Sequence, residues 1–105
     1  MAQKSRREMI EEMLAASPKD TFLRYGLAME FAREGQPAKA VATMRALISD
    51  QPTYIPAYFQ AGQILAKDGN SEAAAELLRQ GISVARAQSD FHAAEEMAGL
   101  LSQIE

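Results

Sequence analysis

The chain has 105 residues, of which 48 % are hydrophobic and 24 % charged, and its formal net charge is −3. This length suits one domain, and the hydrophobic content predicts a packed core rather than intrinsic disorder. A pI of about 5.2 without a clustered basic excess argues against a nucleic-acid-binding surface. Cysteine is absent, which excludes disulfides and thiol chemistry.

Helical periodicity runs along the whole chain, and strand alternation is missing. The breaks in this pattern predict six helices, at residues 3–15, 20–34, 37–50, 54–67, 71–86 and 90–103. Gly35 and Gly69 are expected to take a positive φ just past a helix end, and Pro37 suits a first helical turn. Because the connecting turns are short, neighbouring helices must be antiparallel, and the predicted fold class is all-α.

The chain repeats itself with a period of 34 residues. Pro18 recurs as Pro52, and Gly35 recurs as Gly69. Other positions at this spacing keep their size class: Phe31 with Leu65, Ala40 with Ala74, and Met44 with Leu78. Self-similarity at this period is typical of stacked helical hairpins, which offer a surface rather than a reaction centre.

The two units resemble the tetratricopeptide repeat, whose pattern over 34 residues is W-x₂-L-G-x₂-Y, A-x₃-F, P. The residues that carry the resemblance are Leu27, Ala28, Phe31, Ala40, Met44 and Pro52, then Tyr58, Ala61, Gly62, Leu65, Ala74 and Leu78. Arg24 departs from the pattern, since it stands where the family favours a large aromatic residue. The resemblance implies a right-handed stack of helical hairpins. In such a stack Ala28 and Gly62 are small because two helices cross closely there, and bulky neighbours lock the crossing.

A single domain over residues 1–105 is expected. Its parts are an N-terminal packing helix (3–15), repeat 1 (18–51), repeat 2 (52–86) and a C-terminal capping helix (89–105). Met9 and Met13 are expected in the core of the first helix contact. Gly81 stands where Leu47 sits one repeat earlier, which predicts less packing there. Arg86 stands where the next proline would be, which predicts a longer fifth helix.

The resemblance also implies a concave surface lined by the first helix of each repeat. The inward positions define a predicted peptide-binding groove, consisting of Phe22, Tyr25, Met29, Arg33, Phe59, Gln63 and Lys67. Their spacing of three and four residues places them in one stripe on each helix. In an alternative interpretation, Phe22 and Phe59 only cover adjacent helices, while Arg33 and Lys67 complement helix C-termini.

Some members of this family grip the acidic C-terminus of a chaperone through Lys and Asn at the inward positions. Here Tyr25, Met29, Phe59 and Gln63 occupy those positions and cannot form such a clamp. The resemblance therefore implies an apolar or amphipathic partner segment. Arg33 and Lys67 are expected to meet its acidic groups at the groove edge.

Catalytic and metal-binding chemistry is not expected. His92 is the only histidine, and no cysteine or ordered acid pair accompanies it. Residues 68–72 loosely resemble a calcium loop, but Arg79 stands where that loop requires a glutamate. No cofactor signature is present, so we expect neither a cofactor nor a catalytic residue.

The sequence therefore predicts a non-catalytic module that binds another protein. The alternative is a structural homodimer that associates through its terminal helices, which an exposed apolar stripe on an end helix would favour. The N-terminus lacks the apolar stretch of a secretory signal, and no apolar run is long enough to span a membrane. We expect a cytoplasmic protein without nucleic-acid or membrane partners.

Overall fold

The computed structural model describes residues 3–105, and within this range it contains six helices and no strand. The helices are α1 (Arg6–Ala16), α2 (Thr21–Arg33), α3 (Pro37–Asp50), α4 (Ile55–Lys67), α5 (Ser71–Ala87) and α6 (Phe91–Ile104). Every predicted helix is present, and the ends agree within one residue except at the start of α1. There Ser5 and Glu8 form a capping box, so the helix begins at Arg6 rather than at residue 3.

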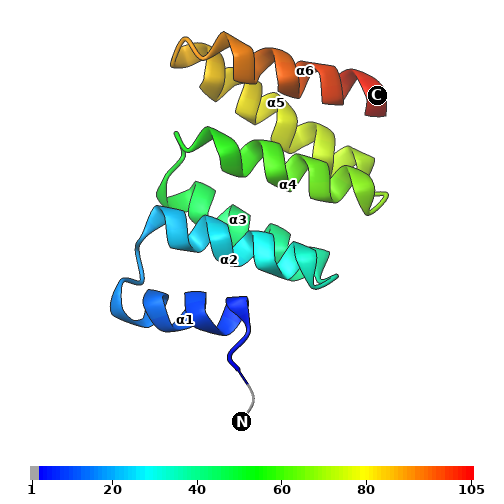
Figure 1. Cartoon of the computed structure of the whole chain (residues 1–105). Coiled ribbons are helices and arrows are strands. Elements are labelled where there is room, and N and C mark those ends of the chain that lie inside the picture. The colour runs from blue at the N-terminus through cyan, green and yellow to red at the C-terminus, as the bar shows by residue number, and fades with distance from the viewer. Residues whose placement is uncertain (1–2) are drawn as a thin grey trace.

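Consecutive helices are antiparallel and stack into an elongated domain of 48 × 28 × 20 Å (Figure 1). Helices α2, α4 and α6 run in one direction, and α1, α3 and α5 run in the other. Each helix packs mainly against its neighbours in the chain. This arrangement of local contacts is that of a helical solenoid.

Three turns share one geometry. Gly35 and Gly69 have φ values of 75° and 84°, as predicted, and Ser89 takes the corresponding place between α5 and α6 with a φ of 59°. The residue that follows each of them donates back to the last helical turn, as Asn70 N–H does to the Leu65 carbonyl oxygen at 2.8 Å. These bonds end the helix and reverse the chain within three residues.

Small residues set the closest helix approaches, as the repeat pattern predicts. A Cβ atom at Gly62 would lie 2.6 Å from Leu78 Cδ2, so α4 and α5 could not cross this closely with any larger residue. Ala28, Ala40 and Ala74 are fully buried. Close-packed interiors cannot absorb an added methyl group at such points without a shift of the neighbours.

The expectation of looser packing at Gly81 is wrong. A Cβ atom there would lie 2.6 Å from Met97 Sδ on α6 and 2.6 Å from Tyr58 Cβ on α4. The missing side chain is replaced by Met97, which is fully buried. Gly81 therefore allows α6 to pack closely on α5. The predicted lengthening of the fifth helix is confirmed, since α5 has 17 residues and α3 has 14.

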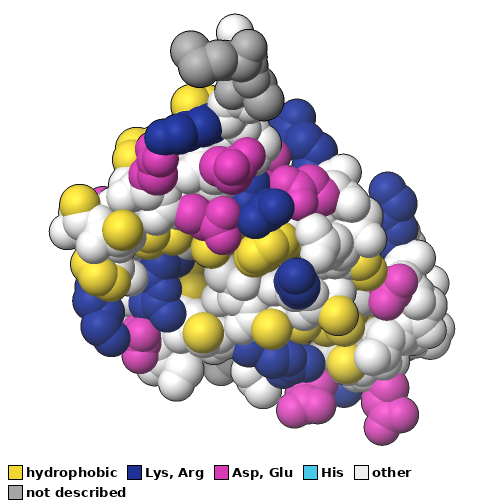
Figure 2. Space-filling model, turned by 90° about the horizontal axis from the view of Figure 1, so that it is seen from below, with side chains coloured by type: hydrophobic (Ala, Val, Ile, Leu, Met, Phe, Trp, Pro, Cys, Tyr) yellow, Lys and Arg dark blue, Asp and Glu magenta, His cyan; other side chains and the backbone are white. Residues whose placement is uncertain are grey.

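The expectation that Met9 and Met13 belong to the core is also wrong, because they are 46 % and 50 % exposed. Helix α1 packs mainly against α2 and buries none of its own residues. An ion pair of 3.0 Å from Arg7 to Glu34 helps to hold it in place. Seen from this end of the stack, hydrophobic side chains reach the surface between charged ones (Figure 2).

Candidate peptide-binding groove

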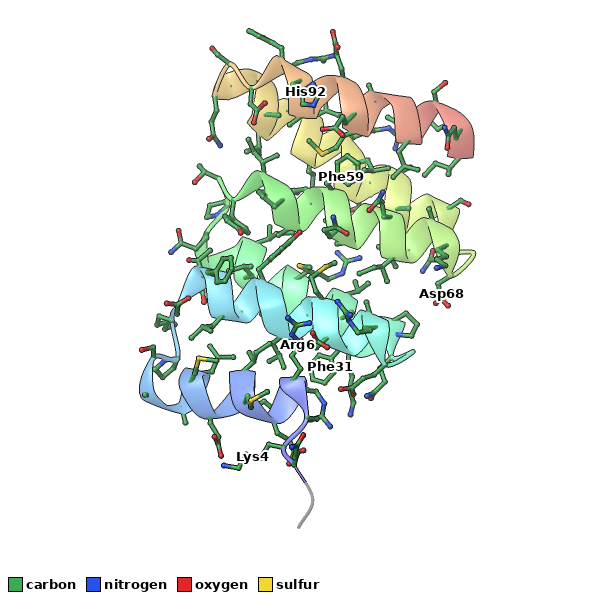
Figure 3. The ribbon with its side chains drawn as sticks, in the orientation of Figure 1. Lys4, Arg6, Phe31, Phe59, Asp68 and His92 are labelled. Atoms are coloured by element: carbon green, nitrogen blue, oxygen red, sulfur yellow. The ribbon has the colours of Figure 1, made fainter. Side chains whose placement is uncertain are left out.

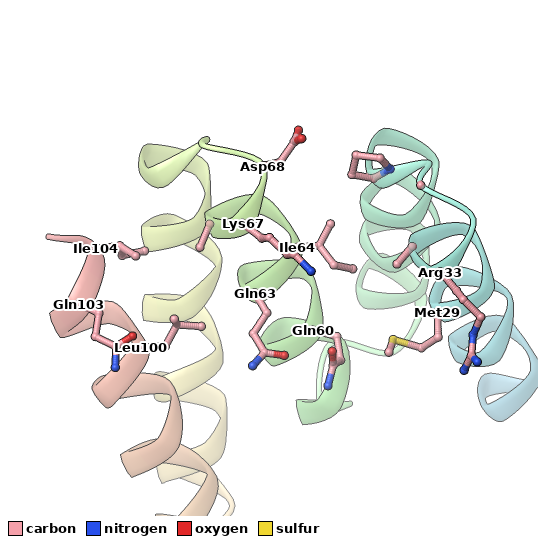
Figure 4. A pocket seen from close by; sticks show the side chains of 14 residues that line it. Met29, Arg33, Gln60, Gln63, Ile64, Lys67, Asp68, Leu100, Gln103 and Ile104 are labelled. Carbon is pink, nitrogen blue, oxygen red and sulfur yellow. The ribbon is translucent and has the colours of Figure 1, made fainter.

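A hollow of about 1040 Å³ lies between α2, α4 and α6 on the face that these three parallel helices share (Figure 4). We call it the larger hollow. Met29, Ile64 and Leu100, one from each helix, supply its apolar surface, and Arg33 and Lys67 bring positive charge. The full lining is Met29, Ala32, Arg33, Gly35, Pro37, Gln60, Gln63, Ile64, Ala66, Lys67, Asp68, Leu100, Gln103 and Ile104.

A smaller hollow of about 510 Å³ lies between the N-terminal halves of α4 and α6. Its lining is Thr53, Tyr54, Ile55, Pro56, Phe59, Gln60, Gln88, Asp90, His92, Ala93 and Glu96. Phe59 on α4 and His92 on α6 belong to neighbouring helices (Figure 3), and His92 Nε2 lies 3.3 Å from Glu96 Oε1. Gln60 lines both hollows, so together they form one groove along α4.

Five of the seven predicted groove residues line these hollows. Met29, Arg33, Gln63 and Lys67 line the larger hollow, and Phe59 lines the smaller one. The other two residues line neither hollow. Phe22 lies in the first turn of α2 and is 76 % exposed.

Tyr25 lines neither hollow and is half-buried beside Tyr54, in the connection that precedes α4. Its ring meets that of Tyr54 edge-on, with 5.7 Å between the ring centroids and 75° between the planes. Burial, together with the neighbouring Tyr54, raises the pKa of the Tyr25 phenol above its usual 10.0. Tyr25 therefore keeps its proton at neutral pH, and its ring connects α2 with the residue that precedes α4.

Sequence reasoning missed the contribution of α6 to the groove. Leu100, Gln103 and Ile104 line the larger hollow, but α6 was assigned only a capping role. Their spacing of three and four residues was an available signal, since it places them on one helix face. Gln60 and Ile64 on α4 were missed for a different reason, because they flank the inward positions that the family pattern marks.

Arg33 is connected to a buried carboxylate. Glu30 is the buried charged residue of the described chain, at 7 % exposure, and its carboxylate lies 3.6 Å from Arg33 Nε and 3.5 Å from Arg6 Nε. Two guanidinium groups thus share one carboxylate, which leaves positive charge beside the larger hollow. Arg33 and Lys67 also lie in the last turns of α2 and α4, where helix carbonyl groups favour cations.

Within residues 3–105, no group of three or more His, Asp or Glu side chains is placed to hold a metal ion. Over the same range, no helix is long and apolar enough to cross a membrane. The His92–Glu96 contact is an exposed pair one helical turn apart on α6. What the geometry offers is two adjoining hollows lined by apolar, amide and charged side chains.

Antiparallel helical hairpins that stack with a fixed sequence period define a helical-repeat protein. The family model described as "Tetratricopeptide repeat" matches residues 31–100, which is more than half of the chain. The chain therefore belongs to the tetratricopeptide repeat family. A comparison with curated proteins finds no match.

Solved structures agree with this assignment. A tetratricopeptide repeat domain protein from Salinibacter ruber is 27 % identical, with a TM-score of 0.79 over 84 % of this chain and 89 % of that one. A protein from Bordetella parapertussis is 25 % identical, with a TM-score of 0.84 over 97 % and 89 %. The type III secretion translocator chaperone SycD from Yersinia enterocolitica shares the fold at 15 % identity, with a TM-score of 0.83 over 93 % and 68 %.

Proposed function

We propose that this protein binds a segment of a partner protein in the groove formed by α2, α4 and α6, without catalysing a reaction. The observation that carries the proposal is that the two hollows adjoin along α4 at Gln60, because together they offer a long surface that combines apolar, amide and charged side chains. A groove of this kind suits an amphipathic helix or an extended peptide. One protein with this fold is a chaperone of secretion translocators, which is consistent with a binding role for the scaffold.

The anchors of binding are expected to be the apolar side chains at the centre of the groove. Met29, Ile64 and Leu100 come from three different helices and are all half-buried, so each has free surface left for a ligand. Burying apolar surface contributes about 25 cal/mol per Å², and central anchors commonly dominate affinity. Met29 adds an adaptable thioether, which suits varied partner side chains.

Affinity capture from a lysate of the source organism tests this proposal with three baits. The first bait is the wild-type protein, and the second carries Met29→Ala with Leu100→Ala in the groove. The third carries Ile48→Ala with Val84→Ala, which are half-buried on α3 and α5 and line neither hollow. A partner retained by the first and third baits and lost from the second supports groove binding. Equal capture by all three folded baits contradicts it.

A second candidate function is self-association through α1, which the exposure of Met9 and Met13 favours. Met13 lies one repeat before Leu47, which is fully buried. Helix α3 packs against both α2 and α4, whereas no helix precedes α1 in the described residues. An α1 from a second copy would cover the same surface, and the pair would be antiparallel if the two-fold axis is perpendicular to α1.

Sedimentation velocity over a range of protein concentrations tests self-association. If α1 forms the interface, Met9→Lys with Met13→Lys should convert a dimer into a monomer. Phe91→Lys is the control, because Phe91 is 60 % exposed on the opposite terminal helix. A wild-type protein that stays monomeric at all concentrations contradicts this candidate, and loss of the dimer only in Phe91→Lys assigns the interface to α6.

A further inference from the structure

We infer that the groove has electrical polarity and selects a partner segment that carries acidic residues at one end and basic residues at the other. This inference rests on the proposed function of the groove and adds the chemistry of its ligand. The parallel course of α2, α4 and α6 gathers their C-terminal ends at one end of the groove and their N-terminal ends at the other (Figure 1). The polarity inferred here is set by the full charges of side chains at those ends, against the opposite partial charges of the helix termini.

The C-terminal end of the groove carries net positive charge. Arg33 and Lys67 line the larger hollow, and Asp68 is the one acidic residue among its lining residues. The carboxylate of Glu30 is already shared between Arg33 and Arg6, so it does not cancel both guanidinium charges. An acidic side chain of a ligand would therefore be attracted to this end.

The N-terminal end of the groove carries negative charge. Asp90 and Glu96 line the smaller hollow, and its lining contains neither Lys nor Arg. The Asp90 carboxylate accepts the Ala93 N–H at 3.1 Å and caps α6. A basic side chain of a ligand would be attracted here.

The length of the groove sets the spacing of these charges. Helix α4 has 13 residues and spans both hollows, which corresponds to roughly 20 Å at 1.5 Å per residue. A helical ligand would therefore separate its charged ends by about 13 residues, and an extended ligand by about 6 residues. Because this separation exceeds the screening length of about 10 Å at moderate salt, each end acts independently.

Selection from a phage-displayed library of random 16-residue peptides provides the probe. The expected result is an enriched set with apolar residues in the centre and opposite charges at the two ends. The best enriched peptide is then synthesised in four versions, with its own charges, with both ends acidic, with both ends basic, and with both ends Gln. Affinity is measured by fluorescence polarisation at low and at high salt.

Two charge reversals of the protein locate each end. Lys67→Glu should weaken the parent peptide roughly three- to tenfold at low salt, and the peptide with both ends basic should recover the loss. Glu96→Lys should also weaken binding of the parent peptide, and here the peptide with both ends acidic should recover the loss. Arg45→Glu and Glu76→Lys are matched controls, since these exposed residues on α3 and α5 line neither hollow.

The outcomes distinguish a failure of the groove polarity from a failure of groove binding itself. Enriched peptides that lose binding to Met29→Ala with Leu100→Ala, but show no separation of charge, would overturn the polarity and leave groove binding intact. The polarity is also wrong if Lys67→Glu has no larger effect than Arg45→Glu. Peptides that bind the groove variant as well as the wild type, or a selection without enrichment, would overturn both.

Discussion

Gly81→Ala tests how closely α6 is seated on the stack, and thus how one wall of the groove is built. The added Cβ would lie 2.6 Å from Met97 Sδ and 2.6 Å from Tyr58 Cβ, well inside van der Waals contact. Met97 can move its thioether, but Tyr58 Cβ is attached directly to the α4 backbone. Relief therefore requires α5 to shift relative to α4 or α6.

The expected magnitude follows from two opposing terms. Overpacking of a close-packed core typically costs about 1–3 kcal/mol. Replacing Gly by Ala inside a helix returns up to about 1 kcal/mol of backbone propensity. Because Gly81 is in close contact with α4 on one side and α6 on the other, we expect the free energy of unfolding to fall by about 1–2 kcal/mol. For a domain near this size each kcal/mol corresponds to roughly 4–8 °C in Tm.

Urea and thermal unfolding followed by far-UV circular dichroism measure this loss, and Gly99→Ala is the matched control. Gly99 lies inside α6, and a Cβ there would meet nothing within 4 Å. The same substitution should therefore stabilise the protein by about 0.5–1 kcal/mol at Gly99 and destabilise it at Gly81. A Gly81→Ala protein that is as stable as the wild type would refute the close seating of α6.

Three further predictions concern the stack itself. Ala40→Leu and Ala74→Leu should each lower the free energy of unfolding by roughly 1–3 kcal/mol, because both alanines are fully buried at helix crossings, and unchanged urea midpoints would contradict this. Ser89→Gly should raise Tm modestly, since a φ of 59° is strained for serine, and the expected gain of up to about 1 kcal/mol would be absent if another contact favoured serine. The hydrogen bond from Arg24 holds the pKa of Asp50 below its usual 3.8, so its contribution to stability is present above that pH and is lost as the pH falls through the lowered pKa. In Asp50→Asn, Tm should therefore fall less steeply with pH below about pH 4 than in the wild type. An unchanged pH dependence of Tm in this range would show that the Asp50–Arg24 pair contributes nothing.

The ends of the helices could be predicted well because they depend on local chemistry. Glycine at the positive-φ positions 35 and 69, proline at the first turn of α3, and an N-cap such as Asn70 act within a few residues of where they stand. The 34-residue period then led to the stack of hairpins, since a repeated pattern of small and large residues implies a repeated helix crossing. These signals require no knowledge of distant neighbours.

The predicted groove was less complete, because a groove depends on which helices lie opposite one another. Leu100 and Ile104 lie on a helix that the sequence marks only as a cap, and they become groove residues once α6 is placed beside α4. The edge-on contact of Tyr25 with Tyr54, which lies 29 residues further along the chain, could not be predicted from periodicity. Periodicity identifies the face of a helix on which a residue lies, but it does not identify what faces it.

The amino-acid pattern alone was sufficient for the fold class, the six helices and their antiparallel order, because these follow from backbone conformation and short turns. The burial of individual side chains could be determined only from the tertiary structure. Met13 and Leu47 occupy the same place in the repeat, yet one is half exposed and the other fully buried, because α3 has helices on both sides and α1 packs mainly against α2. From the sequence, Gly81 likewise predicts a loosely packed position. In the tertiary structure it is closely packed, because Met97 on α6 and Tyr58 on α4 both contact it.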